Sequence, residues 1–398
     1  MNIGNILVIG NSGVGKSKLI RSVLGERVSI HGWKNWDVMD KLRISESPEL
    51  NFRLIDTMRF QPGYFNSVRA VKDVKEFLKE WMRYDADENP NIDLIWLCVD
   101  GTAANQIQET LLQYAKAITA WKNIPVIVVI TKSYSKGDRA QNVALAEQAF
   151  ADDPEMQKKM HKVIPVVAAS YKIDELHFIS PSGLIDLIRA SNEFMPKGVK
   201  MNEKELTRFI RKRKRILTHE ILRATVQSGI SLGETPHNRD DLNALKAVQM
   251  GEIRKIATVY DIHPYDYLKD YEALLVSHTA SEEALSNVLQ SAGKASDRGV
   301  GQTVIHGTAM GSLVYIAGKI SSELFRESDQ NNTPMPPVSE LDALFHKRME
   351  ETFYPHLPEL FSALSVNDGD RAIRRAIVQA MEESTVKTAK ANPVNESF

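Results

Sequence analysis

The chain has 398 residues, enough for two or three domains, and 43% of them are hydrophobic, which allows a sizeable core. Lysine and arginine (50) nearly balance aspartate and glutamate (51), so the net charge of −1 provides no global field toward nucleic acid or an anionic membrane. The single cysteine, Cys98, excludes an internal disulfide, and its apolar neighbours predict a buried thiol. No basic and apolar leader precedes the first apolar run, so we expect a cytoplasmic protein.

The first elements along the chain are a short apolar strand (residues 5–9), a glycine-rich loop (10–17) and an amphipathic helix (16–24). The loop reads Gly-Asn-Ser-Gly-Val-Gly-Lys-Ser, the pattern G-x-x-x-x-G-K-[ST]. In this pattern the loop amides surround phosphates, the lysine reaches the β- and γ-phosphate oxygens, and the last hydroxyl binds Mg²⁺. We therefore predict that a nucleoside triphosphate binds at Asn11, Ser12, Gly13, Val14, Gly15, Lys16, Ser17 and Lys18.

Apolar segments and helical patterns then alternate up to about residue 195. Strands that are apolar at every position are typical of a parallel sheet covered on both faces. Two predicted strands close together indicate one antiparallel hairpin in that sheet. We predict an α/β fold for residues 1–195, a three-layer P-loop NTPase sandwich with a mixed, mostly parallel sheet. The predicted strands are 5–9, 41–44, 52–56, 94–99, 126–130 and 163–168, and the predicted helices are 16–24, 67–83, 104–121, 139–150 and 184–192.

The second half of the chain is predicted to be helical. Pro196 and Gly198 interrupt the helical periodicity within a predicted linker, residues 192–204. An α-helical domain follows over residues 203–384, and residues 385–398 are predicted to be a disordered tail. The predicted helices are 203–227, 240–259, 264–276, 281–289, 303–326 and 338–352.

Two segments of this half have alternative interpretations. Residues 211–215 are five consecutive basic residues, which could bind lipid headgroups or RNA phosphates. Five consecutive positions spread around a helix, however, and this favours a solvated linker helix. Residues 299–318 carry no charge and are long enough to span a bilayer. Their polar residues, together with Gly307 and Gly311, favour a helix packed closely in a core or interface.

Residues 1–195 resemble the Era-like group of translation-factor-type GTPases. The resemblance rests on the phosphate loop, on Asp56 to Arg59 at the position of D-x-x-G, on Thr131 to Tyr134 at N-K-x-D, and on Ala168 to Ser170 at S-A-K. It implies GTP binding through Thr131, Lys132, Ala169 and Ser170, and Mg²⁺ binding by Ser17 directly and by Asp56 through water. Ser29 would replace the Mg²⁺-binding threonine of the first switch, or be a polar loop residue.

Three residues depart from the family pattern. Arg59 stands where the family has glycine, and it would either act on the phosphates as an arginine finger or face solvent. Phe60 cannot orient an attacking water, so we expect slow hydrolysis. Tyr134 cannot reproduce the two hydrogen bonds that an aspartate accepts from guanine. ATP binding or mixed specificity therefore stays an alternative to GTP.

The leading hypothesis is a Mg²⁺-dependent GTP-binding protein, a slow GTPase that acts as a nucleotide-controlled switch, with Lys16 and Arg59 as catalytic residues. The helical half is loosely similar to a C-terminal domain of uncharacterised function in bacterial Era-like proteins, some of which are linked to membranes. It would bind a protein effector or self-associate, and nucleic acid is not an expected partner. The alternatives are a nucleotide-binding scaffold without efficient hydrolysis and a GTPase recruited to the inner face of the membrane.

Overall fold

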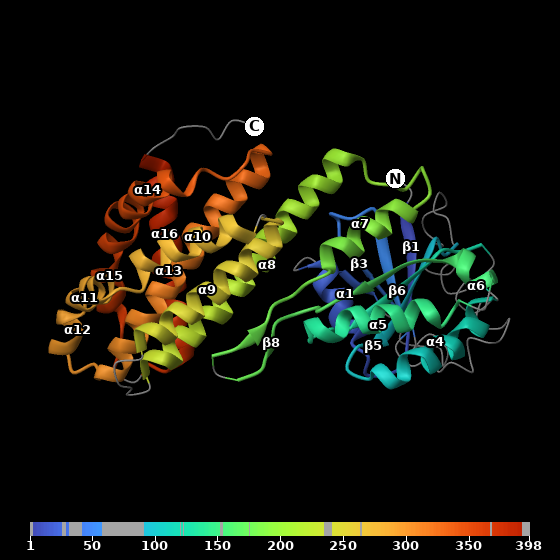
Figure 1. The fold of residues 1–398 in the computed structure, drawn as a ribbon, viewed down its shortest axis with the longest axis horizontal. Helices are drawn as coiled ribbons and strands as arrows, with labels where there is room; N and C mark the ends of the chain where they lie inside the picture. Colours follow the sequence, from blue (N-terminus) through green and yellow to red (C-terminus); the bar gives the residue numbers. More distant parts are fainter. Residues whose placement is uncertain are drawn as a thin grey trace. The chain divides into compact units, whose positions relative to one another are not determined.

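The computed structural model divides the chain into two compact units (Figure 1). One consists of Met1–Tyr171 and Ile179–Arg213, and the other of Lys172–Phe178 and Lys214–Phe398. The first boundary between them therefore falls in a hairpin, and the second inside a helix rather than at residues 192–204. The structure describes residues 3–25, 29–31, 42–57, 91–119, 121, 123–151, 154–174, 176–234, 241–262, 265–366 and 368–391.

Seven of the described strands form the sheet of the first unit, in the order β2-β3-β4-β1-β5-β6-β7. β1 is parallel to β4 and β5, and β6 is parallel to β5 and β7, whereas β3 is antiparallel to both β2 and β4. The predicted mixed, mostly parallel sheet is therefore confirmed. The strands are β1 (Gly4–Ile9), β2 (Ser29–His31), β3 (Leu42–Glu46), β4 (Phe52–Thr57), β5 (Leu94–Asp100), β6 (Val126–Thr131) and β7 (Met160–Pro165).

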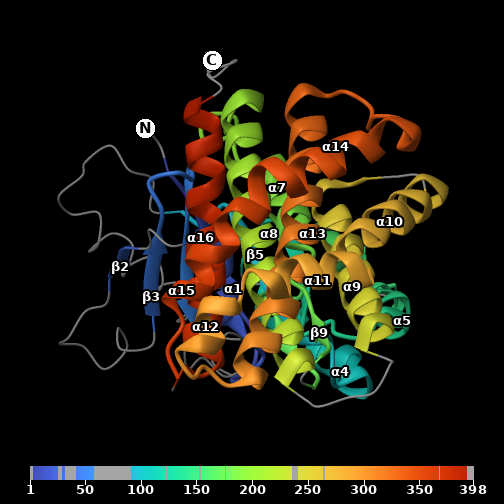
Figure 2. The same ribbon diagram turned by 90° about the vertical axis from the view of Figure 1, so that its left-hand side faces the viewer.

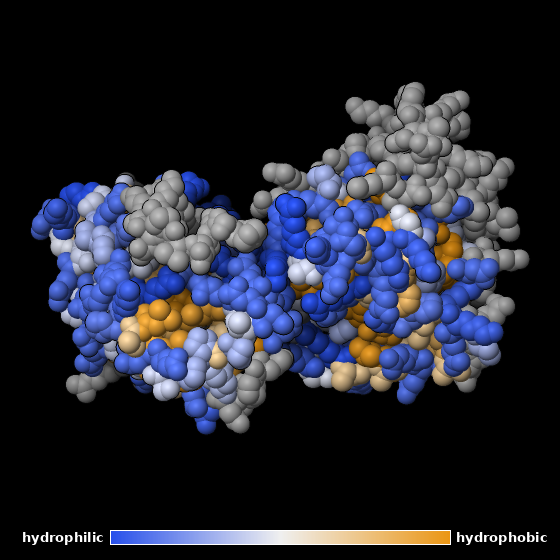
Figure 3. Space-filling view, turned by 90° about the horizontal axis from the view of Figure 1, so that it is seen from above, coloured by the Kyte–Doolittle hydropathy of each residue, from blue (hydrophilic) through white to orange (hydrophobic). Residues whose placement is uncertain are grey.

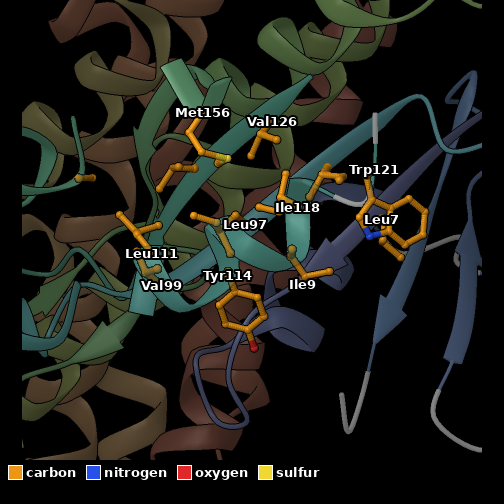
Figure 4. Close-up of a cluster of buried hydrophobic side chains, with 14 of the residues drawn as sticks. Leu7, Ile9, Leu97, Val99, Leu111, Tyr114, Ile118, Trp121, Val126 and Met156 are labelled. Atoms are coloured by element: carbon orange, nitrogen blue, oxygen red, sulfur yellow. The ribbon is translucent and has the colours of Figure 1, made fainter. Parts of the chain in front are cut away.

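Helices cover both faces of this sheet, which explains why its central strands are apolar at every position. On one face Trp96 of β5 donates from Nε1 to Ser191 Oγ of α7 at 3.0 Å. On the other face Leu97 and Val99 pack with α4 residues such as Leu111 in a buried cluster (Figure 4). The helices of the unit are α1 (Lys16–Leu24), α4 (Ala104–Thr119), α5 (Lys136–Gln148), α6 (Pro154–Lys159) and α7 (Leu184–Phe194). Cys98 is buried, as predicted.

The sequence pattern missed the shortest elements of this unit and displaced one strand. β2 and the small hairpin of β8 (Tyr171–Lys172) and β9 (Phe178–Ile179) were not predicted, because two or three residues show no periodicity. The six-residue helix α6 was missed as well. β7 begins at Met160, before the predicted residue 163, because its exposed first half lies at the sheet edge and is polar. The predicted helix 67–83 lies outside the described residues.

The second unit is helical, as predicted, and α13 lies at its centre (Figure 2). α13 contacts α9, α10, α11, α12 and α16, and residues 305–318 of its uncharged stretch are almost entirely buried. The interpretation of residues 299–318 as a packed core helix is therefore confirmed. The helices are α8 (Glu203–Glu234), α9 (Asp241–Tyr260), α10 (Tyr265–Thr279), α11 (Glu282–Gln290), α12 (Gly293–Asp297), α13 (Gln302–Asn331), α14 (Leu341–Arg348), α15 (Leu357–Ala363) and α16 (Asp370–Ala391), with short turns η3 (Val338–Glu340), η4 (Met349–Phe353) and η5 (Tyr354–His356).

Two sequence predictions for this half need correction. α16 continues to Ala391, so the predicted disordered tail does not begin at Thr385, and residues 392–398 lie outside the described residues. The basic run at 211–215 is only partly solvated, because Arg213 and Lys214 are buried whereas Lys212 and Arg215 are exposed. Arg213 donates to the carbonyl oxygens of Ser22 and Val23 at the end of α1, which helix geometry leaves without partners.

The buried Lys214 pairs within its own unit with Asp329, at 2.7 Å between Nζ and Oδ1. On the face seen in Figure 3, hydrophilic side chains predominate and are interrupted by several hydrophobic patches. Within the described ranges, none of the helices combines the length and the apolar character that a membrane crossing requires.

Candidate functional site

The glycine-rich loop connects β1 to α1 in a backbone conformation that its glycines make accessible. Gly10 has φ 143° and Gly15 has φ 100°, both in the region that favours glycine. A Cβ atom on Gly10 would lie 2.3 Å from the carbonyl oxygen of Cys98 on the neighbouring strand. Gly15 is the N-cap of α1, so the free amides of the first helical turn open onto the loop. The structure therefore has the strand, loop and helix that the sequence pattern predicts.

Lys16 projects into this loop. Its Nζ donates to Gly10 O at 2.7 Å and to Asn11 O at 3.0 Å. Burial lowers the pKa of Lys16, and the negative charge of Asp56 opposes this shift. The ammonium is thus held among backbone acceptors, at the place where an anionic ligand of the loop would be bound.

Ser17 and Asp56 form the candidate Mg²⁺ site. Ser17 Oγ donates to Asp56 Oδ2 at 2.9 Å, and Asp56 Oδ1 is buried without a hydrogen-bond partner among the described residues. Burial raises the pKa of Asp56, while the bond from Ser17 and the charge of Lys16 oppose this. A hydroxyl beside an unsatisfied carboxylate oxygen fits a hard cation with oxygen ligands. The side chain of Ser29 and the whole of Arg59 lie outside what the structure describes.

Any ion here needs ligands beyond this pair. Within the described residues, no group of three or more histidine, cysteine, aspartate or glutamate side chains could hold a metal. Mg²⁺ commonly binds through one or two protein oxygens, with phosphates and water completing its shell. The pair of Ser17 and Asp56 is compatible with that mode.

The loop after β6 is tied to the glycine-rich loop. Thr131 Oγ1 lies 2.5 Å from Val14 O and 2.9 Å from Val99 O, within hydrogen-bond distance of both. Lys132 Nζ donates to Asp100 Oδ2 at 2.6 Å. The structure thus brings the predicted residues Thr131 and Lys132 to the edge of the sheet that carries the phosphate loop.

Tyr114 of α4 also supports the loop, and no sequence motif predicted this contact. Its hydroxyl donates to Asn11 Oδ1 at 3.2 Å, and in Figure 4 it points away from the apolar cluster. Asp100 was missed too, although a carboxylate at the end of an apolar strand is the signal that identified Asp56.

The loop after β7 holds the last two predicted residues, Ala169 and Ser170, both half-buried. Their neighbour Tyr171 stacks on Tyr134 of the loop after β6, with ring centroids 4.2 Å apart and planes 19° apart. Ser133 N donates to Val166 O at 3.2 Å and joins the two loops. The predicted site segments therefore converge on one edge of the sheet.

One family model matches a segment of the first unit. Residues 5–132 match the family described as 50S ribosome-binding GTPase. No curated protein sequence matches the chain.

Three solved structures have a weak likeness to the chain. Era in complex with MgGDPNP and nucleotides 1506–1542 of 16S ribosomal RNA is 21% identical, with 57% of this chain and 67% of that chain covered and a TM-score of 0.29. The cytosolic domain of the T. maritima FeoB iron transporter in a GDP form is 14% identical, with 80% and 98% covered and a TM-score of 0.30. An S. thermophilus NFeoB mutant bound to GDP is 13% identical, with 81% and 98% covered and a TM-score of 0.30.

Proposed function

We propose that this chain, whose first unit is a P-loop GTPase domain, is a Mg²⁺-dependent GTP-binding protein that hydrolyses GTP slowly and acts as a nucleotide-controlled switch. The observation that carries the proposal is the loop from Gly10 to Ser17, with Lys16 inside it and Asp56 beside Ser17. These residues fit the binding of a triphosphate and its cation, and they lie within the segment that matches the GTPase family.

Lys16 would bind the β- and γ-phosphate oxygens. In the structure its ammonium donates to neutral carbonyl oxygens, those of Gly10 and Asn11. Hydrogen bonds between charged partners are about twice as strong as neutral ones, so phosphate oxygens would replace these acceptors. The amides of the loop and of the first turn of α1 would donate to the same phosphates.

Mg²⁺ would lie beside Ser17 and Asp56, the first as a direct ligand and the second through water, with Ser29 as the proposed third residue. The ion would neutralise charge on the phosphate oxygens. Asp56 Oδ1 has no donor within the part of the chain that the structure describes, which supports this assignment because a buried acceptor without a donor is costly.

Slow turnover is proposed from the sequence. Phe60 has no group that could orient water, and Arg59 would supply positive charge only if it reached the phosphates. The helical unit would respond to the nucleotide state by binding a protein effector or by self-association, in the cytoplasm or at the periphery of the membrane.

Titration calorimetry of the full chain with a non-hydrolysable GTP analogue, with and without Mg²⁺, tests nucleotide binding. The wild type is expected to bind with Mg²⁺, and Lys16→Ala should lose about tenfold or more in affinity, because a charged hydrogen-bond donor is removed. Arg21→Ala changes an exposed cation on the same helix and serves as the control. Absence of wild-type binding, or equal affinity of Lys16→Ala, would refute the proposal.

A nucleotide-binding scaffold is the second candidate, and Phe60 favours it. Phosphate release at high protein concentration separates the two functions. Turnover that disappears in Lys16→Ala supports the switch, and binding with no turnover supports the scaffold.

A further inference from the structure

Two loops at one edge of the sheet come together beside the phosphate loop. They follow β6 and β7, and in parallel sheets the carboxyl ends of neighbouring strands form the usual ligand site. Thr131 Oγ1 is 2.5 Å from Val14 O of the phosphate loop, and Ser133 N donates to Val166 O at 3.2 Å. A nucleotide bound by the phosphate loop would therefore have these loops within reach of its base.

Each of these two loops contributes one aromatic ring to the protein surface. Tyr134 and Tyr171 are stacked at 4.2 Å, and Tyr171 is 46% exposed. Tyr134 lies in the loop directly after β6, and Tyr171 is the first residue of β8. A flat aromatic surface is thus open to solvent beside the phosphate loop.

Both oxygens of the carboxylate that ends β5 already accept hydrogen bonds within the protein. Asp100 Oδ2 accepts from Lys132 Nζ at 2.6 Å, and Oδ1 accepts from Thr102 N and Oγ1 at 2.9 and 2.7 Å. Burial opposes ionisation of Asp100, but these bonds outweigh it and hold the pKa below its usual value. Asp138 belongs to the first turn of α5, where its backbone amide donates to the capping Ser135 Oγ, and its side chain is exposed to solvent.

We propose that the Tyr134–Tyr171 pair is the base-binding surface of this site, and that it selects nucleotides by stacking on a planar purine rather than by hydrogen bonds to the guanine edge. The inference rests on the proposed nucleotide-binding function. Stacking does not separate guanine from adenine, because every base has a π-face. Strong discrimination requires buried polar groups that one base leaves unpaired, and the groups around Asp100 are already paired.

Competition of GTP, ATP, CTP and inorganic tripolyphosphate against a fluorescent GTP analogue, on the full chain with Mg²⁺, measures the selectivity. ATP is expected to bind within about tenfold of GTP, and CTP more weakly because its smaller ring stacks less. A preference for GTP over ATP of more than about tenfold would overturn the inference while leaving the proposed function intact. If tripolyphosphate and every nucleotide fail to compete, the proposed function fails instead.

Variants of the pair sharpen the test. Tyr171→Ala should weaken GTP and ATP by the same factor, about tenfold, and leave tripolyphosphate unchanged. Tyr134→Asp should add a bidentate acceptor and raise the GTP preference about tenfold or more. Ile173→Ala is the matched control, since it removes an exposed apolar side chain (60% exposed) near Tyr171 that is not one of the two stacked rings. Unchanged nucleotide affinity in Tyr171→Ala, or a loss for GTP alone, would contradict the inference.

Discussion

Glu252 of α9 places a carboxyl group in the buried interior of the helical unit. Both of its carboxylate oxygens are buried without a hydrogen-bond partner among the described residues. Thr225 faces it from α8, but its Oγ1 donates to Ile221 O at 2.9 Å. A Cβ on Gly318 would lie 2.5 Å from the Glu252 carboxyl carbon, so a glycine is needed to make room for it. Burial raises the pKa of Glu252 well above its usual 4.5, and the charge of Lys255 opposes this.

The raised pKa has a consequence for stability. Below pH 4.5 the carboxyl of Glu252 is protonated in the folded and unfolded states alike. As the pH rises above 4.5, the unfolded state ionises first while the folded state keeps its proton, so the fold loses stability until the pH passes the raised folded pKa. The advantage of Glu252→Gln over the wild type in free energy of unfolding should therefore grow by roughly 1–3 kcal/mol from pH 5 to pH 8.

Urea unfolding of both proteins at the two pH values measures this difference. Glu359→Gln changes an exposed glutamate of the same unit, and its effect should be small at both pH values. A Glu252→Gln effect that is equal at pH 5 and pH 8 would contradict the assignment.

At the scale of elements, the crossing of α8 and α13 depends on glycines from both helices. A Cβ on Gly233 would lie 2.4 Å from His306 O, and one on Gly311 would lie 2.8 Å from Ile230 Cγ1. The helix backbones approach so closely that no side chain fits between them. The sequence indicated this packing for α13 through Gly307 and Gly311, whereas the matching glycines of α8 were not singled out.

Alanine substitutions separate close packing from helix propensity. Gly233→Ala should destabilise the helical unit by about 1–3 kcal/mol, because the new methyl meets backbone that cannot move aside. Gly251→Ala in α9 should stabilise it by about 0.5–1 kcal/mol, since among the described residues its Cβ would meet only Lys255 Nζ, at an ordinary contact distance of 3.7 Å. Chemical denaturation followed by circular dichroism measures both. If the two substitutions shift stability in the same direction, the packing argument is wrong.

Local pattern made part of the fold and site predictable. β1, the phosphate loop and α1 follow from an apolar run, three glycines and a helical repeat that are adjacent in the chain. The short α12 and α15 and the charged α16 were missed because their apolar periodicity is weak. The stack of Tyr134 on Tyr171 and the bond from Tyr114 to Asn11 join distant segments, and no spacing rule reveals such tertiary contacts.

At the scale of the whole molecule, α8 contributes residues to both compact units. Arg213 belongs to the first unit and bonds the end of α1, and the next residue, Lys214, belongs to the second and pairs with Asp329. Because these two buried cations are adjacent in the same helix, unfolding of α8 within one unit would also displace the cation of the other unit from its own partners. We therefore expect the two units to unfold as a coupled pair.

Two spectroscopic probes can test this coupling, because all five tryptophans lie in Met1–Tyr171 of the first unit, while circular dichroism at 222 nm also follows the helices of the second. A ligand present at about 100 Kd stabilises the state that binds it by about 2.7 kcal/mol. Mg²⁺ and a GTP analogue should therefore raise the urea midpoint of tryptophan fluorescence, and the midpoint of the dichroism signal should follow it. Lys16→Ala should lose both shifts. A dichroism midpoint that stays fixed while the fluorescence midpoint rises would show that the units unfold independently.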